Sequence, residues 1–151
     1  DQAMLYLDRR LTWGEDDTLA IGQVKQYIAK ATGDSDDEIK VYMPDYTEKG
    51  YKDADYGQEL YFPTWKIPAD HPIVQAGVKA YTDLYEKDPI VDKWTFSTNG
   101  VAIMGRRGIP CIGFGPGHED QAHAPNEVNR IADLVTCSAF YAALVYSLED
   151  E

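Results

Sequence analysis

Alternating apolar and polar positions near the start of the chain predict a β-α-β unit. Residues 3–7 (Ala-Met-Leu-Tyr-Leu) and 39–43 (Ile-Lys-Val-Tyr-Met) have the composition and period of strands. We expect them to pair as antiparallel neighbours in one sheet. Between them, apolar residues repeat at helical spacing over residues 20–31, after an acidic stretch at 15–17 that suits a helix N-terminus, and Gly33 supplies a stop signal.

Both periodicities stop after Pro44. Residues 46–69 interleave tyrosines with glycine, aspartate and lysine, and such a long irregular stretch is typical of a linker or a functional loop. We therefore divide the chain into a β-α-β domain at residues 1–45, a linker at 46–69 and a second domain at 70–151.

The second domain has the alternation of strands and helices that characterises α/β folds. Asp70 is expected to cap a helix that has Pro72 in its first turn and ends before Asp88-Pro89. The other expected elements are a strand at 94–97, a short element at 101–104, a buried strand at 109–114 and a long helix at 126–147. Loops at the C-terminal ends of strands hold sites in α/β domains, so we expect the loop after residue 114 to face an open cleft.

Composition and charge exclude several classes of protein. The 14 basic and 26 acidic side chains give a net charge of −12, spread along the chain, which argues against a nucleic-acid or membrane partner. Hydrophobic residues make up 44% of the chain, enough for a packed core. The longest apolar run, at 134–148, is interrupted by polar residues and is shorter than the roughly 20 residues of a membrane span.

The cysteines and the chain start bear on localisation. Cys111 and Cys137 lie in apolar contexts typical of reduced thiols. No signal peptide pattern is present at the start, so we expect a cytoplasmic protein. The chain lacks an initiator Met, and we expect it to be a piece of a longer protein.

The residues best suited to chemistry lie between 113 and 127. His118 and His123 stand near carboxylates and could bind zinc, but their spacing of five matches no local zinc motif. Alternatively, His118 is a solvated loop residue and Pro-Asn-Glu at 125–127 only begins the helix. The glycines at 113–117 do not form a dinucleotide fingerprint, because acidic residues and several others separate them from the helix. No nucleophile motif surrounds Ser97 or the cysteines.

Three motifs taken together resemble a known family. They are Trp-Thr-Phe-Ser-Thr-Asn-Gly at 94–100, Gly-Ile-Pro-Cys-Ile-Gly-Phe-Gly-Pro-Gly at 108–117, and Ala-His-Ala-Pro-Asn-Glu at 122–127. In this order, with a long helix after them, they resemble the C-terminal third of the zinc metallopeptidases of the acetylornithine deacetylase, succinyl-diaminopimelate desuccinylase and carboxypeptidase G type. The detail is most similar to a subgroup linked by name to selenium metabolism. Asp-Arg-Arg at 8–10 resembles the Asp-x-Arg of the family's lid.

The resemblance implies an α/β architecture in two parts. The first would be the second half of a ferredoxin-like α+β lid, and the second the C-terminal part of a zinc-peptidase-like α/β catalytic domain. The N-terminal part of that domain, with the other metal ligands and the general base, has no counterpart in the sequence. The implied partners are this missing part of the same enzyme, a second copy bound through the lid, and a small-molecule substrate.

The resemblance also implies roles for individual residues. His123 matches the family's last ligand to a pair of zinc ions, for which cobalt or manganese could substitute. Asn126 and Glu127 match the rest of that motif and would orient the ligand loop. Arg10 matches a lid arginine that pairs with a substrate carboxylate, with a surface ion pair as the alternative. The substrate-contact loop would comprise Ser97, Thr98, Asn99 and Gly100. Relatives often have Asp near the position of Asn99, which leaves the substrate open.

The leading hypothesis is that the chain is the C-terminal portion of a dinuclear metal-dependent amidohydrolase or peptidase. It would cleave an amide bond in a small N-acyl, carbamoyl or peptide-like substrate. Because the general base and most metal ligands are missing, we expect no catalytic residue within the chain and no activity from it alone. The alternative is a non-catalytic assembly or dimerisation module, joined to another chain through the strand edge near Asp8 and the Tyr-rich segment.

Overall fold

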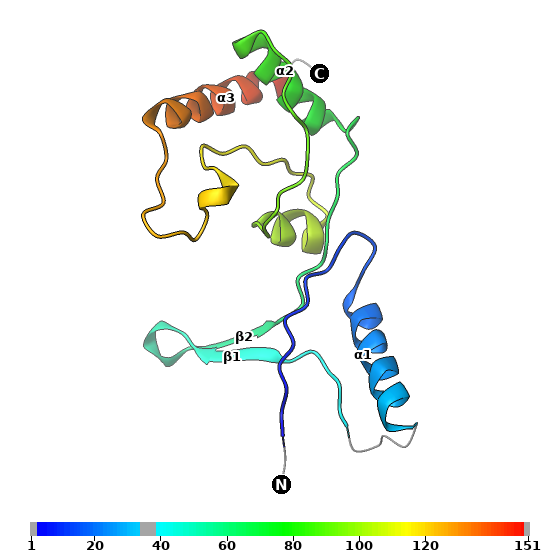
Figure 1. The fold of residues 1–151 in the computed structure, drawn as a ribbon. Helices are drawn as coiled ribbons and strands as arrows, with labels where there is room; N and C mark the ends of the chain where they lie inside the picture. The colour runs from blue at the N-terminus through cyan, green and yellow to red at the C-terminus, as the bar shows by residue number, and fades with distance from the viewer. Residues whose placement is uncertain (1–2, 34–38, 150–151) are drawn as a thin grey trace. The chain divides into compact units, whose positions relative to one another are not determined.

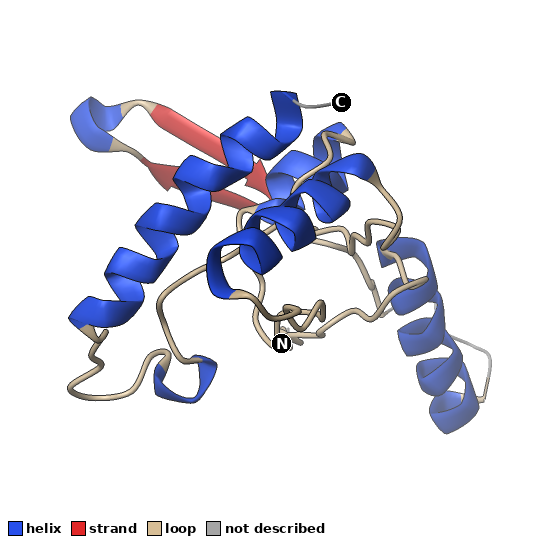
Figure 2. Cartoon of the chain, turned by 90° about the horizontal axis from the view of Figure 1, so that it is seen from above, coloured by secondary structure: helices blue, strands red, loops and turns tan. Residues whose placement is uncertain are grey.

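The computed structural model describes residues 3–33 and 39–149, which form two units that divide between Thr64 and Trp65. The elements in chain order are α1 (Asp17–Thr32), β1 (Asp45–Lys49), η1 (Tyr51–Asp53), β2 (Asp55–Glu59), α2 (Pro72–Tyr85), η2 (Val101–Arg106), η3 (Glu119–Gln121) and α3 (Ile131–Glu149) (Figure 1). Among the described residues, the strands are confined to one hairpin (Figure 2). The chain is therefore a mixed protein of helices and strands.

Helix α1 confirms the helix predicted at residues 20–31. It begins where the side chain of Asp16 accepts a hydrogen bond from the backbone N–H of Leu19 at 2.7 Å. It ends at Gly33, which has a left-handed φ of 81° and donates its N–H to the carbonyl of Ala29 at 2.9 Å. Both caps are formed by residues at the helix ends, Asp16 and Gly33. The sequence therefore contains local signals for the start and the end of this helix.

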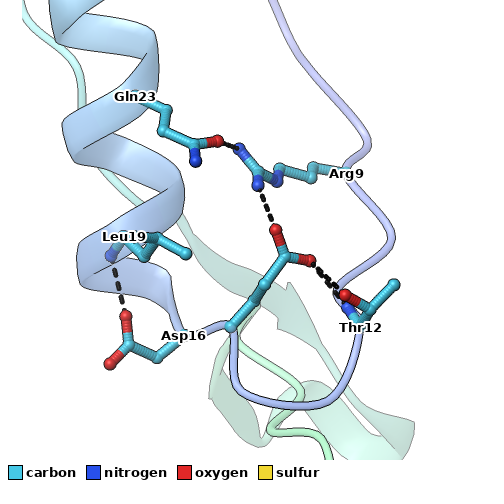
Figure 3. Close-up of polar contacts among 6 residues, drawn as sticks. Arg9, Thr12, Asp16, Leu19 and Gln23 are labelled. Atoms are coloured by element: carbon cyan, nitrogen blue, oxygen red, sulfur yellow. Dashed lines mark hydrogen bonds and ion pairs between the residues drawn. The ribbon is translucent and has the colours of Figure 1, made fainter.

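A network of side-chain hydrogen bonds fixes the turn before α1 (Figure 3). Arg9 donates to Glu15 at 2.6 Å and to Gln23 at 2.7 Å. The second carboxylate oxygen of Glu15 accepts from the backbone N–H and the hydroxyl of Thr12, at 2.7 Å and 3.0 Å. The backbone bond from Thr12, followed by the bond from Arg9, lowers the pKa of Glu15. The ionised carboxylate therefore holds the chain entering the helix.

The strands predicted at 3–7 and 39–43 are wrong, because the described structure pairs neither segment. The side chains of residues 4–7 are exposed, as is that of Tyr42. Apolar alternation indicates which face of a strand could be buried, but a strand also needs a neighbour that completes its hydrogen bonds. Neither segment has such a neighbour among the described residues.

Strands form instead at Asp45–Lys49 and Asp55–Glu59, almost entirely within residues 46–69, the segment predicted to be irregular. β1 and β2 pair antiparallel, from Asp45 opposite Glu59 to Lys49 opposite Asp55. In the connection, Lys52 and Asp53 have left-handed φ values of 64° and 56°. All five residues of β1 are exposed, so the hairpin has no apolar face for a sequence pattern to reveal. This is why the prediction missed it.

Helices α2 and α3 pack against each other and form the core of the second unit. The buried cluster consists of Ala76, Ala80, Phe140 and Leu144, with Tyr81, Ile112, Phe114 and Ala143 packed against it. The rings of Phe114 and Phe140 lie 4.1 Å apart between centroids. The small side chains on α2 leave room for the large ring that α3 contributes.

Helix α2 confirms the predicted helix, but its cap is His71 rather than Asp70. The Nδ1 atom of His71 accepts a hydrogen bond from the N–H of Ile73 at 3.2 Å, and Pro72 occupies the first position of the helix. An imidazole can replace a carboxylate here because either supplies an acceptor for a helix N–H that has no partner within the helix. The predicted cap of the helix is therefore one residue too early.

Helix α3 begins at Ile131, later than the predicted start at Asn126. The backbone of Asn126 has a φ of 62°, which is incompatible with a right-handed helix.

By length and composition, residues 131–148 of α3 could also cross a membrane, with a mean hydropathy of 1.6. The core helix of a soluble protein passes the same test. Phe140 and Leu144 of this helix are buried against the rest of the unit.

The strands predicted at 94–97 and 109–114 are also wrong, since neither segment forms a ladder among the described residues. The second segment was expected to be buried, and only part of it is. Ile112 and Phe114 contact the core, whereas Ile109 is exposed. The short element predicted at 101–104 does form, as the wide helical turn η2.

Candidate functional site

Two segments that carry predicted site residues are joined by hydrogen bonds. One carboxylate oxygen of Glu119 accepts from the backbone N–H of Thr95 at 2.8 Å, and the other accepts from its hydroxyl at 2.6 Å. One residue further along, the ring of Phe96 meets the imidazole of His123 edge to face, with 6.0 Å between centroids and 83° between planes. The structure thus brings the predicted metal ligand to the segment that precedes Ser97.

The charge of Glu119 is stabilised by this contact. The hydroxyl of Thr95, and then its backbone N–H, lowers the pKa of Glu119, while the nearby Asp92 has a smaller opposing effect. At neutral pH the carboxylate is ionised and only accepts hydrogen bonds, which makes both bonds charge-assisted.

His123 is exposed and has an unusual backbone. Its φ is 61°, and Asn126 three residues later has a φ of 62°. Left-handed conformations are uncommon for residues other than glycine and cost free energy, so surrounding contacts must hold them. Hydrogen bonds close two overlapping turns, one before His123 and one that contains it: Ala122 donates to the carbonyl of Glu119 at 3.2 Å, and Ala124 donates to the carbonyl of Gln121 at 3.0 Å. The loop therefore presents His123 outward in a defined conformation.

The predicted substrate-contact residues form the turn that leads into η2. The hydroxyl of Thr98 accepts from the N–H of Gly100 at 3.2 Å, and the carbonyl of Asn99 accepts from Ala102 at 3.0 Å. The side chains of Ser97, Thr98 and Asn99 are exposed, whereas Gly100 is buried. Three side chains suited to polar contact with a small molecule are thus displayed on one tight turn.

Two glycines in this unit lie close to tryptophan rings. A Cβ atom on Gly100 would collide with the indole of Trp65, and one on Gly113 would stand 2.7 Å from the indole nitrogen of Trp94. Such distances are shorter than packed atoms allow. The close approach of these rings explains glycine at both positions without any phosphate or cofactor.

Arg10 lies in the first unit, apart in sequence from these residues. Its side chain is exposed and stands 3.8 Å from Asp8, a geometry that contributes little to stability. The neighbouring Arg9, which sequence reasoning did not single out, makes the close contacts instead. Asn126 and Glu127 are exposed in the loop before α3.

Sequence reasoning missed a second polar cluster at the start of α3. Arg130 donates two hydrogen bonds to the carboxylate of Asp133, at 2.7 Å and 2.9 Å, and His118 lies 3.8 Å from it. The bonds from Arg130 lower the pKa of Asp133. His118, Asp133 and the buried Cys137 line one pocket of about 170 Å³. The spacing of Arg130 and Asp133, three apart at a helix start, is a signal that could have revealed the ion pair.

The described residues do not form a complete metal site. Among them, no three His, Cys, Asp or Glu side chains stand close enough to share an ion. A zinc site needs three or four ligands, so the described residues alone do not supply one, and the exposed imidazole of His123 stands without further ligand-type side chains grouped around it.

Comparisons with known proteins place these observations in a family. The model of "Peptidase family M20/M25/M40" matches residues 10–147. The chain is 49% identical to "Uncharacterized protein YgeY" from Escherichia coli strains K12 and O157:H7, over 97% of this chain and 36% of each relative. It is 26% identical to "N-formyl-4-amino-5-aminomethyl-2-methylpyrimidine deformylase" from Bacillus subtilis, over 89% of this chain and 31% of the relative. The chain thus spans about a third of the length of these relatives. No solved structure matches it.

Proposed function

Because the chain belongs to peptidase family M20/M25/M40, we propose that it is the C-terminal portion of a dinuclear metal-dependent amidohydrolase. The complete enzyme would cleave an amide bond in a small N-acyl, carbamoyl or peptide-like substrate. One relative is named for the removal of a formyl group from nitrogen, which is the hydrolysis of an amide and favours the N-acyl class. The observation that carries the proposal is the family motif at 122–127 on a loop that presents His123 outward.

We propose His123 as the one metal ligand of this chain. The metal is zinc, with cobalt or manganese as substitutes, and a pair of ions supplies Lewis-acid polarisation and an activated water when bound. His123 contributes a neutral imidazole nitrogen, and Asn126 and Glu127 hold the loop that carries it. The remaining ligands and the general base belong to the rest of the polypeptide, so this chain alone is expected to be inactive.

The same proposal assigns substrate contacts to two segments. Ser97, Thr98 and Asn99 offer exposed hydroxyl and amide groups for hydrogen bonds to a polar substrate, and Gly100 closes the turn that displays them. Arg10 is positioned on an exposed segment where its guanidinium can bind a carboxylate through two parallel hydrogen bonds. Neither segment supplies a nucleophile, so both act in binding rather than in bond cleavage.

The partners we propose follow from exposed apolar surface. Helix α3 exposes Ile131, Val135, Val145 and Tyr146, which a soluble protein would cover. We assign this face to the missing N-terminal part of the catalytic domain. We assign residues 1–45 to a lid of ferredoxin-like type, through which two copies of a cytoplasmic enzyme would pair.

A second candidate, a non-catalytic assembly module, is favoured by one observation. Residues 4–7 combine exposed Met, Leu and Tyr side chains with backbone groups that are not paired in a sheet. Such a segment could add a strand to another chain. The two candidates differ in whether the metal and the chemistry depend on His123.

The test is to replace His123 by Ala in the complete polypeptide, with His118→Ala as a matched control on the same loop. We expect His123→Ala to lower kcat by orders of magnitude and to release metal, because losing a ligand disturbs the charge and geometry around the ion. His118→Ala should keep most activity. Arg10→Ala should mainly raise KM, since its carboxylate contact would form equally in the ground and transition states. A His123→Ala enzyme with full metal content and unchanged turnover would show that this chain supplies no metal ligand. That result would refute the proposal and favour the assembly role for this chain.

A further inference from the structure

Glu119 connects the two segments of the candidate site. Its side chain contacts the segment at residues 95–100, and its backbone leads into the loop that carries His123. Both of its carboxylate oxygens bond to Thr95, 24 residues earlier in the sequence. Its own carbonyl closes the turn η3 by accepting from Ala122, the residue before His123. Because this hydrogen-bonded turn ends one residue before His123, the placement of Glu119 restricts where the backbone of His123 can lie.

Thr95 transmits the same constraint in the other direction. Because its N–H and its hydroxyl are both engaged, the backbone at residue 95 is fixed relative to η3. Phe96 comes next and places its ring edge to face with the imidazole of His123. Ser97 follows directly, and the turn of residues 97–100 begins there.

The contact could in principle be a surface staple that only stabilises the loop. Three features indicate that the contact also orients His123. The two bonds are short and charge-assisted, they bridge two segments that both carry predicted site residues, and they adjoin a histidine whose left-handed backbone needs support from its surroundings. A metal ligand loses affinity when its ring is free to turn.

We propose that Glu119 is a positioning residue, which acts through Thr95 and Phe96 to fix the imidazole of His123 relative to the turn of residues 97–100. This inference rests on the proposed role of His123 as a metal ligand. It extends that role by naming the side chains that orient the ligand from outside its own motif.

The test begins with four variants of the complete polypeptide, to which Phe96→Leu, its combination with Glu119→Ala, and His123→Ala are added. Glu119→Ala removes both bonds, Thr95→Val removes the hydroxyl bond while keeping the shape, and Thr95→Ser keeps both bonds. Asp120→Asn changes the exposed neighbouring carboxylate and serves as the control. Zinc affinity is measured by competition with a chelator, together with kcat, KM and the melting temperature.

We expect Glu119→Ala to weaken zinc binding and lower kcat, each by about 10- to 100-fold, the range typical of residues that orient a ligand. Thr95→Val should show a smaller loss of both, while Thr95→Ser and Asp120→Asn should remain close to the parent enzyme. KM should change little, because no substrate contact is removed. Adding Glu119→Ala to Phe96→Leu should cost less than the product of the single effects, because both act on the same ring.

The outcomes separate this inference from the function on which it rests. If His123→Ala releases metal while Glu119→Ala and Thr95→Val lower only the melting temperature, the contact is a staple and the inference is wrong while the proposed function stands. If His123→Ala leaves metal binding intact, both are wrong. If Glu119→Ala does not fold, Thr95→Val against Thr95→Ser decides, and equal zinc affinity in those two variants overturns the inference.

Discussion

Replacing Phe140 by Ala tests the contact between α2 and α3, on which the second unit depends. The side chain of Phe140 is 3% exposed, so the substitution removes an almost fully buried ring from the core. Its ring stacks on Phe114 and lies beside Gly77, where a built Cβ atom would stand 3.9 Å from its Cζ. Phe to Ala changes in cores typically cost 3–5 kcal/mol. Because Phe114 and Ile112 are only partly buried and can move into the space, we expect about 3 kcal/mol.

The measurement is urea unfolding followed by far-ultraviolet circular dichroism, with the free energy taken from the midpoint and slope. Phe140→Leu, which keeps most of the volume, should cost about 1 kcal/mol. Val145→Ala is the control, since Val145 lies exposed on the same helix and its change should stay within about 0.5 kcal/mol. A Phe140→Ala chain as stable as the Val145→Ala chain would show that α2 and α3 do not form this core.

Two further predictions concern the start of α1. Asp16→Ala removes the acceptor for the N–H of Leu19 and should destabilise the helix by about 1 kcal/mol, while Asp16→Asn should restore most of the loss in the same unfolding measurement. Glu15 has a folded pKa below its ordinary value of 4.5, so its contribution is complete above that pH and is lost as the pH falls below it towards the folded pKa. The stability difference between the parent and Glu15→Gln should therefore shrink on acidification below pH 4.5. A difference that stays constant or grows would mean that the bonds from Arg9 and Thr12 do not favour the ionised carboxylate.

Local signals in the sequence predicted the helices better than the strands. A helix satisfies its own hydrogen bonds and displays its apolar face and its caps within about a dozen residues, as at Asp16, Gly33 and Pro72. The segments at 3–7 and 109–114 have the composition of strands, but their pairing depends on a neighbour that their own residues do not encode. The hairpin of β1 and β2 shows the opposite case, because its pairing is local and its faces are both solvated.

Some residues of the candidate site were predicted from the sequence and others were not. The family resemblance of the motifs at 94–100 and 122–127 pointed to the loop at residues 97–100 and to His123. Glu119 was not recognised, because an acidic residue among other polar residues in a loop gives no indication of a partner 24 positions away. The left-handed backbones at His123 and Asn126 were also invisible, since neither residue type requires that conformation.

The contact between Gly100 and the indole of Trp65 constrains the order in which these two positions can change during evolution. A side chain at position 100 would overlap the ring, so a lineage that acquires one there first must pass through a strained intermediate. If the ring is lost first, the intermediate has only a cavity, which costs stability but preserves the course of the backbone. Homologues should therefore include smaller residues opposite Gly100, whereas a larger residue at position 100 should be rare wherever the tryptophan is retained. The two positions are expected to vary together, with the change at position 65 coming first.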